Sequence, residues 1–342
     1  MTARAIDSMS EAPRLADLRA FTPVALNLDR ARPSIDWGDL RGVRFAEPFF
    51  DRTVERWAGG DPPPLVRTGL DALAALDAEP SLDPSAILMH CSRCGSSLIA
   101  RQLATLPGML VVAEAGPINT LLMEEDAALD ADGAALALRL LVRALGRRRF
   151  GDERGYVLKL SSWNVRRLAR VRRAFPDTPL IWLQRAPDAV AASLIKTAPG
   201  WLALQRRPLQ AESLFGIAAE RVAVMEPDEF CVRALGSLYE AARGIGGDAL
   251  HLDYDELPEA AWRRVAPFLG LAPAEAEIAR MRETARLDAK AAAARPFAPD
   301  AAAAPALPPM LGALVAAELA PLYRGLDGRR AAARDRRAPA CL

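Results

Sequence analysis

The sequence predicts a three-layer α/β fold in which a central parallel sheet is flanked by helices. From residue 86 onward, short apolar runs rich in branched and aromatic residues alternate with amphipathic stretches. Such alternation is typical of parallel strands joined by right-handed helical crossovers. The chain has 342 residues, of which 51% are hydrophobic and 25% charged, so it can enclose a core of this kind.

Each predicted strand is a short apolar run bounded by turn residues. The strands are Ala86–Met89, Leu110–Ala113, Tyr156–Leu160, Pro179–Leu183 and Ala249–Leu252. The helical patterns are Ser97–Leu106, Ala128–Leu145, Val165–Phe175, Asp188–Lys196 and Phe230–Arg243. Ligands bind at the carboxyl ends of strands in such sheets, so the loop after each strand is the place to look for chemistry.

Two flanking regions differ from this core, which spans residues 85–275. Residues 1–84 carry Pro-rich punctuation and are predicted to form an N-terminal extension that docks on the core. Residues 276–342 form an Ala/Pro-rich arm, with a helical pattern at Met310–Tyr323 and a loose basic tail from Arg329. The segment Thr197–Glu226, with Trp201 and Phe215, is expected to line the substrate side.

Composition limits the partners and the compartment. Lys and Arg number 44 and Asp and Glu 43, so no overall basic excess favours nucleic acid. No stretch has the roughly 18 apolar residues that a membrane span needs, and the start of the chain lacks the apolar core of a signal peptide. Four cysteines are too few for a disulfide framework. We expect a cytoplasmic protein that binds neither nucleic acid nor membrane; the oligomeric state is open.

The stretch HCSRCGSS, which follows the first predicted strand, allows three interpretations. Cys91 and Cys94 could form a redox pair at a helix start, where the helix dipole lowers a thiol pKa. They could also supply half of a zinc site, for which His251 and a carboxylate would have to complete the four ligands. A third interpretation is a turn that binds an anion.

The anion site accounts for more of the residues. Gly95 lets the backbone approach a ligand, and the free N–H groups at the start of the next helix attract negative charge. Ser96 and Ser97 add hydroxyl groups, and Arg93 adds a planar guanidinium suited to oxyanions. The pattern G-x-x-x-x-G-K-[ST] of a magnesium-nucleotide loop is absent. We therefore expect no metal.

A second motif follows the fourth predicted strand. In LQRAPDAVAASL, Pro187 and Asp188 suit the first turn of a helix. Ser193 follows Arg185 by eight residues. Together, Arg185 and Ser193 could hold a second phosphate, although for each alone a surface charge or a cap is the simpler explanation.

The two motifs in this order resemble the sulfotransferases that use 3′-phosphoadenosine 5′-phosphosulfate (PAPS), which have a P-loop-like fold. The family's 5′-phosphosulfate loop is matched by Arg93, Cys94, Gly95, Ser96 and Ser97, and its 3′-phosphate motif by Arg185, Pro187 and Ser193. A third stretch, LHLDYDELPEAAWRRVAPFLGL, is similar to the segment that ends the family's core, with Asp255 and Glu256 in exchanged order. The resemblance covers about residues 87–271 and implies PAPS as co-substrate.

The resemblance also implies the catalytic residues. Glu114 follows Arg93 by 21 residues, as the base does in tyrosylprotein sulfotransferases, the glutamate-base type that this chain resembles. A solvated glutamate at a strand end is the alternative. Lys159 lies where the family places a lysine that stabilises the leaving group; Ser161 and Ser162 are its neighbours. Tyr239 could contact the adenine.

One departure concerns the 3′-phosphate. Many members close this site with a late Arg-Lys-Gly loop, which this sequence lacks. Lys290 and Arg295 in the arm could replace it, or could be solvated charges on a linker. The expected function is sulfuryl transfer to a hydroxyl or amine of a carbohydrate, small metabolite or peptide. An ATP-dependent small-molecule kinase and a non-catalytic nucleotide-binding module remain alternatives.

Overall fold

The centre of the molecule is a five-stranded parallel sheet with the order β5-β6-β4-β7-β8. The computed structural model describes residues 17–29, 32–59, 64–123, 129–288, 296 and 307–337. The strands are β4 (Ala86–His90), β5 (Met109–Ala113), β6 (Gly155–Lys159), β7 (Leu180–Gln184) and β8 (Leu250–Asp253). All five predicted strands are therefore confirmed. The central strands β4 and β7 are buried along their whole length, which explains their unbroken apolar runs.

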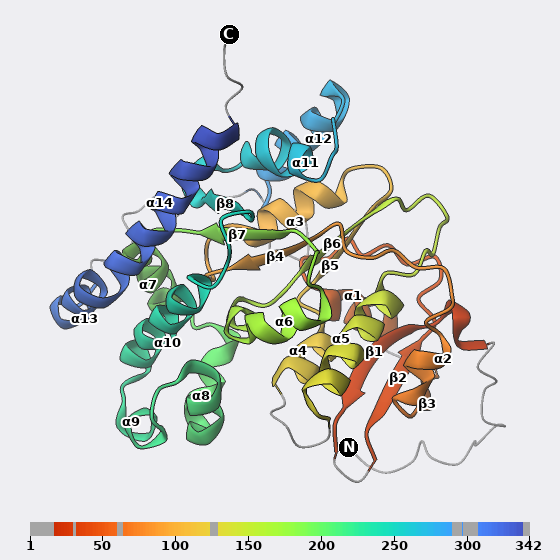
Figure 1. Cartoon of the computed structure of the whole chain (residues 1–342), viewed down its shortest axis with the longest axis horizontal. Helices are drawn as coiled ribbons and strands as arrows, with labels where there is room; N and C mark the ends of the chain where they lie inside the picture. Colours follow the sequence, from red (N-terminus) through yellow and green to blue (C-terminus); the bar gives the residue numbers. More distant parts are fainter. Residues whose placement is uncertain are drawn as a thin grey trace.

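Helices cover both faces of the sheet, as predicted (Figure 1). The predicted helices appear as α3 (Ser96–Ala104), α5 (Ala131–Leu145), α6 (Leu168–Ala174), α7 (Pro187–Lys196) and α10 (Pro227–Ala242). A 3₁₀ segment, Ser162–Arg167, precedes α6. Helix α3 packs against β5 and against α12 (Glu275–Ala285), whereas α10 packs against α7 and the 3₁₀ segment. The three-layer α/β expectation is thus confirmed.

Several shorter helices were not predicted. They are α4 (Gly116–Met123), α8 (Pro208–Phe215), α9 (Ala219–Val224) and α11 (Ala266–Phe268), with a 3₁₀ segment at Gly200–Arg206 and a π-helical turn at Ala261–Val265. Trp201 and Phe215, from the segment expected on the substrate side, are core residues. Both are buried, and their rings pack against Phe230 of α10 with centroids 6.2 and 5.7 Å away. Apolar burial outweighs exposure for side chains of this size.

The N-terminal part contains a second sheet of three antiparallel strands, which lies at one side of the molecule in Figure 1. Its strands are β1 (Thr22–Asn27), β2 (Ser34–Gly38) and β3 (Val66–Thr68), accompanied by α1 (Phe50–Ala58) and α2 (Asp71–Ala75). Strand β1 packs on α4 and α5. Buried Arg147 donates to the carbonyl oxygens of Leu18 and Phe21 at 2.9 and 3.2 Å. The N-terminal part is therefore bonded to the core at its backbone.

The C-terminal helices are α13 (Pro309–Leu314), a π-helical segment (Val315–Leu319) and α14 (Ala320–Arg337). Helix α14 packs on β8 and α10, and Tyr323 Oη donates to Asp253 Oδ2 at 2.9 Å. The basic segment after Arg329, which we expected to be loose, continues this helix as far as Arg337. Its attachment to the core at Tyr323 explains why the helix extends.

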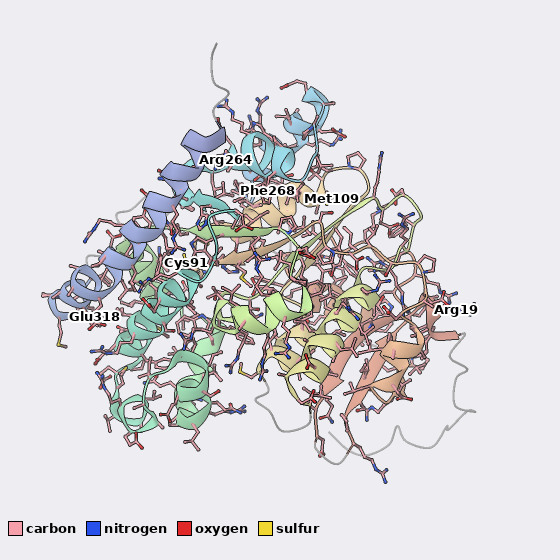
Figure 2. All side chains as sticks on the ribbon, in the orientation of Figure 1. Arg19, Cys91, Met109, Arg264, Phe268 and Glu318 are labelled. Carbon is pink, nitrogen blue, oxygen red and sulfur yellow. The ribbon has the colours of Figure 1, made fainter. Side chains whose placement is uncertain are left out.

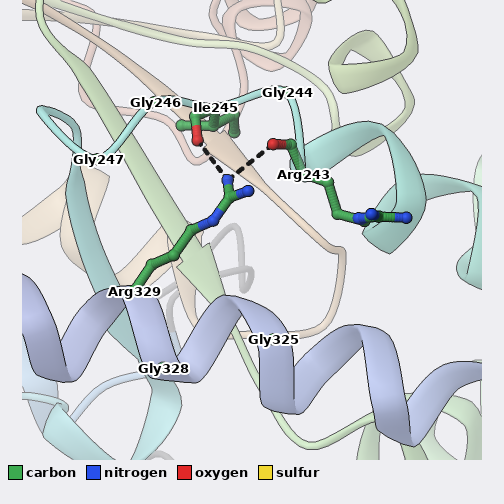
Figure 3. Close-up of a pocket in the computed structure, with 8 residues that line it drawn as sticks. All are labelled: Arg243, Gly244, Ile245, Gly246, Gly247, Gly325, Gly328 and Arg329. Carbon is green, nitrogen blue, oxygen red and sulfur yellow. Dashed lines mark hydrogen bonds between the residues drawn. The ribbon is translucent and has the colours of Figure 1, made fainter.

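Arg329 of α14 caps the end of α10. Its Nη1 donates to the carbonyl oxygens of Arg243 and Ile245 at 2.7 and 2.8 Å (Figure 3). A glycine-lined cavity of about 500 Å³ surrounds this contact. It lies next to the segment that leads into the amino end of β8, away from the strand ends expected to carry chemistry. Within the described ranges, no helix is long and apolar enough to cross a membrane.

Candidate active site

The residues singled out in the sequence follow the carboxyl ends of the parallel strands. Cys91–Gly95 follows β4, Glu114 follows β5, Ser161 comes two residues after β6, and Arg185 follows β7. Because all five strands run in the same direction, these segments share one edge of the sheet. The strand order places Glu114 beside Lys159 of β6, then the β4 loop, then Arg185.

The β4–α3 loop has the backbone shape of an anion cradle. Ser92, Arg93 and Gly95 have φ values of 77°, 49° and 84°. Left-handed conformations cost a non-glycine residue about 1–2 kcal/mol, and they persist where the surrounding structure demands them. Gly95 precedes α3, whose first N–H groups have no intrahelical acceptor. Ser96 and Ser97 are buried at this helix start, so the loop can surround an oxyanion.

A side chain on Gly95 would fill this loop. A Cβ atom built at Gly95 would overlap Leu257 Cδ1 and lie 3.4 Å from the ring of Tyr254. The stretch after β8 therefore closes against the loop, and both the left-handed φ and the crowding require glycine here.

The loop after β4 and the segment after β7 meet through side chains. Arg93 Nε donates to Ser193 Oγ at 2.8 Å, and Arg185 Nη1 donates to the carbonyl oxygen of Arg93 at 3.1 Å. The Arg185 guanidinium also lies 4.2 Å from the ring centroid of Tyr254. Two guanidinium groups and a serine hydroxyl thus lie beside the β4 loop. This arrangement can bind a second anionic group.

Tyr239, which could contact an adenine according to the resemblance, is fully buried, and its hydroxyl donates to the carbonyl oxygen of Arg185. Burial of a large ring on α10 needs a partner for its hydroxyl, and the Arg185 backbone supplies one. Tyr254, to which the sequence analysis assigned no role, is the ring that lies beside Arg185. Its stacking under Arg185 could be found only from the tertiary structure.

Glu114 and Lys159 form an ion pair at the neighbouring strand ends. Lys159 Nζ donates to Glu114 Oε1, and Ser161 Oγ donates to Oε2 at 3.2 Å. The Lys159 side chain is completely buried, and that of Glu114 is 23% exposed. Burial opposes the charge on Glu114, but Lys159 and then His90 outweigh it and hold the pKa of the carboxyl well below its ordinary value.

The backbone of Glu114 is strained and held from several sides. Its φ is +54°, and Glu114 N donates to Lys159 O at 2.8 Å. Asn119 Nδ2 donates to Glu114 O at 3.2 Å, and Asp51 of α1 accepts the next helix's Gly116 N–H at 2.9 Å. Ser92, Arg93 and Glu114 are the non-glycine residues with positive φ in the described part of the chain. Residues with such strained backbones often cluster at functional sites.

The two cysteines of the loop are buried. Figure 2 places Cys91 in the interior, whereas Arg19 and Glu318 lie at the periphery. Cys91 and Cys94 are 0% and 1% exposed, and burial raises the pKa of Cys91. A reactive Cys-x-x-Cys needs the opposite, an accessible first thiol with a lowered pKa. The geometry disfavours the redox interpretation.

The described part of the chain does not support the zinc interpretation. His251 is a residue of β8, and its Nε2 lies 3.1 Å from the Gly246 carbonyl oxygen. Among the residues that the structure describes, no group of three or more His, Cys, Asp or Glu side chains could hold a metal ion. Lys290 and Arg295 lie outside the described residues.

The chain is similar to several solved structures, with low TM-scores. A sulfotransferase from Alicyclobacillus acidocaldarius is 19% identical, with 74% of this chain and 99% of that chain covered and a TM-score of 0.41. A sulfotransferase from Mycobacterium avium is 18% identical over 62% of this chain and 70% of that one, with a TM-score of 0.40. The sulfotransferase domain of the curacin biosynthetic pathway is 16% identical, with coverages of 61% and 80% and a TM-score of 0.37. No family model and no curated protein matches the chain.

One contact at the site could not be read from the sequence. His90, the last residue of β4, also lies at this site. Its Nδ1 accepts the Ser92 N–H at 3.1 Å, and its Nε2 lies 3.6 Å from Glu114 Oε1. This approach joins the ends of β4 and β5, which β6 separates in the sheet, and a linear motif does not encode it.

Proposed function

We propose that this protein transfers a sulfuryl group from PAPS to a hydroxyl or amine acceptor by in-line displacement. The observation that carries this proposal is the Arg93–Ser193 hydrogen bond of 2.8 Å, which joins the two phosphate motifs next to the Glu114–Lys159 pair. Two anion-binding groups and a carboxylate–ammonium pair at one sheet edge suit a donor with two phosphate positions and an acceptor that must lose a proton.

The residues present fit such a donor. The β4 loop, with Gly95, Ser96 and Ser97 at the start of α3, would hold its 5′-phosphosulfate. Arg185 and Ser193 would hold its 3′-phosphate, and the Tyr254 ring beside Arg185 offers a flat apolar face. When bound, PAPS supplies the sulfuryl group and a phosphate leaving oxygen.

Glu114 is suited to accept the proton of the acceptor. Its carboxylate is ionised, because Lys159 and His90 outweigh its burial, and its side chain is 23% exposed. Ser161 fixes one carboxylate oxygen. Glu114 is partly exposed, so an acceptor can reach its carboxylate, and it lies at the same sheet edge as the loop after β4.

Lys159 is suited to stabilise the charge that develops on the leaving oxygen. Its ammonium is desolvated, and electrostatic contacts inside a water-poor site are stronger than in water. In the structure this ammonium neutralises Glu114. Turnover requires Lys159 to turn from Glu114 toward the phosphosulfate, which raises the pKa of Glu114 and makes it a better base.

The acceptor side faces the N-terminal part of the chain. Lys159 Nζ lies 5.5 Å from the ring centroid of Phe49, and Asp51 follows at the start of α1. We infer that α1 and the residues before it shape the space where a carbohydrate, small metabolite or peptide would present its hydroxyl or amine.

The proposal is tested by calorimetric titration with adenosine 3′,5′-bisphosphate in EDTA, with ATP plus Mg²⁺ as the comparison. Metal-free binding that Arg185→Ala weakens supports the proposed donor and justifies an acceptor screen. The matched control is Arg173→Ala on α6, which removes an exposed guanidinium before the amino end of β7. Binding of ATP with Mg²⁺ alone would favour a kinase. Nucleotide binding without turnover of any acceptor would favour a non-catalytic module.

A further inference from the structure

His90 lies between the proposed base, Glu114, and the loop after β4, Cys91–Gly95, which is called the phosphate loop below. Its ring is buried. It is 5% exposed, and its Nε2 is a buried polar atom with no hydrogen-bond partner in the structure. Glu114 Oε1 lies 3.6 Å from this nitrogen. Buried polar atoms are rarely left without partners, so this nitrogen calls for an explanation.

The other ring nitrogen fixes which one carries the proton. Nδ1 accepts the backbone N–H of Ser92 at 3.1 Å, so it must present a lone pair. A neutral imidazole that accepts at Nδ1 carries its hydrogen on Nε2. The Nε2–H therefore points to the side of the ring where Glu114 lies, just beyond hydrogen-bond distance.

We propose that His90 is a positioning residue for Glu114, donating its Nε2–H to Oε1 when Lys159 leaves that oxygen for the sulfuryl donor. This inference rests on the proposed function. In the structure Lys159 occupies Oε1 and His90 stands 3.6 Å away. Once Lys159 has turned, the imidazole keeps the carboxylate in place without neutralising it.

The same ring links the base to the donor site. Ser92 has a left-handed backbone, and its N–H is held by His90 Nδ1. A change in the phosphate loop that moves Ser92 would therefore move the imidazole, and with it Glu114. His90 can thus couple occupancy of the phosphate loop to the orientation of the base.

The charged and titratable groups around this contact come from four elements. Lys159 faces it from β6, Cys94 from the β4 loop, Glu114 from the end of β5, and Asp51 from α1. Burial and Lys159 oppose an imidazolium, Cys94 and Glu114 favour it, and the pKa of His90 is raised on balance. An imidazolium would nevertheless have to release the Ser92 N–H, because Nδ1 would then carry a proton.

The first experiment is ¹⁵N NMR of the two histidine rings in selectively labelled full-length protein, with and without adenosine 3′,5′-bisphosphate. The chain has only two histidines, so His251→Gln assigns both signals. We expect a protonated Nε2 and an unprotonated Nδ1 for His90, and a shift of Nε2 on nucleotide binding that Glu114→Gln changes. Protons on both nitrogens, or an Nε2 signal unaffected by Glu114→Gln, would overturn the inference.

Two variants separate the two ring nitrogens. The amide oxygen of Asn in His90→Asn takes the place of Nδ1 and keeps the Ser92 contact, whereas the amide nitrogen of Gln in His90→Gln takes the place of Nε2. We expect His90→Asn to lower kcat about tenfold or more and to move the acidic limb of the pH profile to higher pH, because the carboxylate loses a donor. Its affinity for the bisphosphate should change little.

His90→Gln should retain most of the kcat that His90→Asn loses. Its affinity for the bisphosphate should be lower than that of the wild type. Equal losses of kcat in both variants, with no change in the pH profile, would show a purely structural role and overturn the inference. Wild-type protein that fails to bind the bisphosphate would instead overturn the proposed function. The two failures are therefore distinguishable.

Discussion

Arg93 Nε donates a 2.8 Å hydrogen bond to Ser193 Oγ, a residue 100 positions later in the chain. The bond joins the loop after β4 to the second turn of α7, across two neighbouring strands. Ser193 therefore stands between the proposed sites of the 5′- and 3′-phosphates. A ligand that bonds to Ser193 would release Arg93 for the other phosphate.

We expect Ser193→Ala and Arg185→Ala to weaken the binding of adenosine 3′,5′-bisphosphate, and to affect the binding of adenosine 5′-monophosphate less. Loss of a charged contact at Arg185 should cost about 1.5–3 kcal/mol, which is roughly 10- to 150-fold in Kd. Loss of the Ser193 hydroxyl should cost about 1 kcal/mol. Paired calorimetric titrations with both nucleotides measure this. An equal loss of affinity for the two ligands would show that Arg185 and Ser193 do not bind the 3′-phosphate.

Gly95→Ala should destabilise the protein and weaken nucleotide binding. The left-handed backbone costs alanine about 1–2 kcal/mol, and the added Cβ would also meet Leu257. Gly270→Ala is the matched control, because Gly270 has a φ of +71° and nothing within 4 Å of an added Cβ. Urea unfolding should show a loss in both variants and a larger one for Gly95→Ala. Unchanged nucleotide affinity in Gly95→Ala would argue against the proposed anion cradle.

Removal of the Glu114 carboxylate should lower turnover far more than binding. We expect Glu114→Gln to reduce kcat about 10²- to 10⁴-fold, because the acceptor's proton has no base. The glutamine retains the shape and a hydrogen bond to Lys159, so bisphosphate affinity should be nearly preserved. Steady-state rates with an acceptor from the screen, compared with the exposed Glu283→Gln on α12, decide this. Full activity in Glu114→Gln would assign the base elsewhere.

The lowered pKa of Glu114 predicts a pH dependence of stability. Lys159 and His90, working against burial, hold the folded-state pKa below the unfolded value of about 4.3. The resulting stabilisation is fully present above that unfolded value and is lost as the pH falls toward the folded pKa. The difference in free energy of unfolding between wild type and Glu114→Gln should therefore be largest near neutral pH and shrink below about pH 4.5. A constant difference would contradict the ion pair.

Cys91→Ser separates transferase chemistry from redox chemistry. The thiol is fully buried, and it donates to the Ser92 carbonyl at 3.4 Å. A hydroxyl can replace this donor, so turnover should fall by less than about tenfold, through small packing losses. A protein that depends on a dithiol would lose its activity completely. Thiol–disulfide exchange assays on the wild type and the variant give the comparison.

The parallel sheet could be predicted because its strands are buried on both faces and read as continuous apolar runs. The N-terminal sheet could not. Partly exposed residues interrupt the apolar pattern of its strands, as in β1 and β3. Its β1–β2 pairing also shifts register between Pro23 and Ala25. Contacts with α4 and α5 stabilise this sheet, and such contacts are not visible in a local window.

The site shows the same division. Residues within linear motifs, such as Arg93 and Ser193, could be placed because each motif follows a predictable strand. Lys159 was expected to face an anion, and its partner in the structure is the carboxylate of Glu114. The approach of Tyr254 to Arg185 and of His90 to Glu114 depends on the order of the strands in the sheet. That relation belongs to the sheet and not to any one segment.

The hydrogen bond from Gly116 N to Asp51 has a practical consequence for anyone shortening this protein. Asp51 belongs to α1, outside the α/β core, yet it accepts the N–H of the helix that begins two residues after Glu114. A truncated variant starting at residue 85 would leave that N–H and the covered face of α4 in water. The described segments before residue 85 thus support the end of β5 and the start of α4, and expression libraries should vary them only with their contacts to α4 intact.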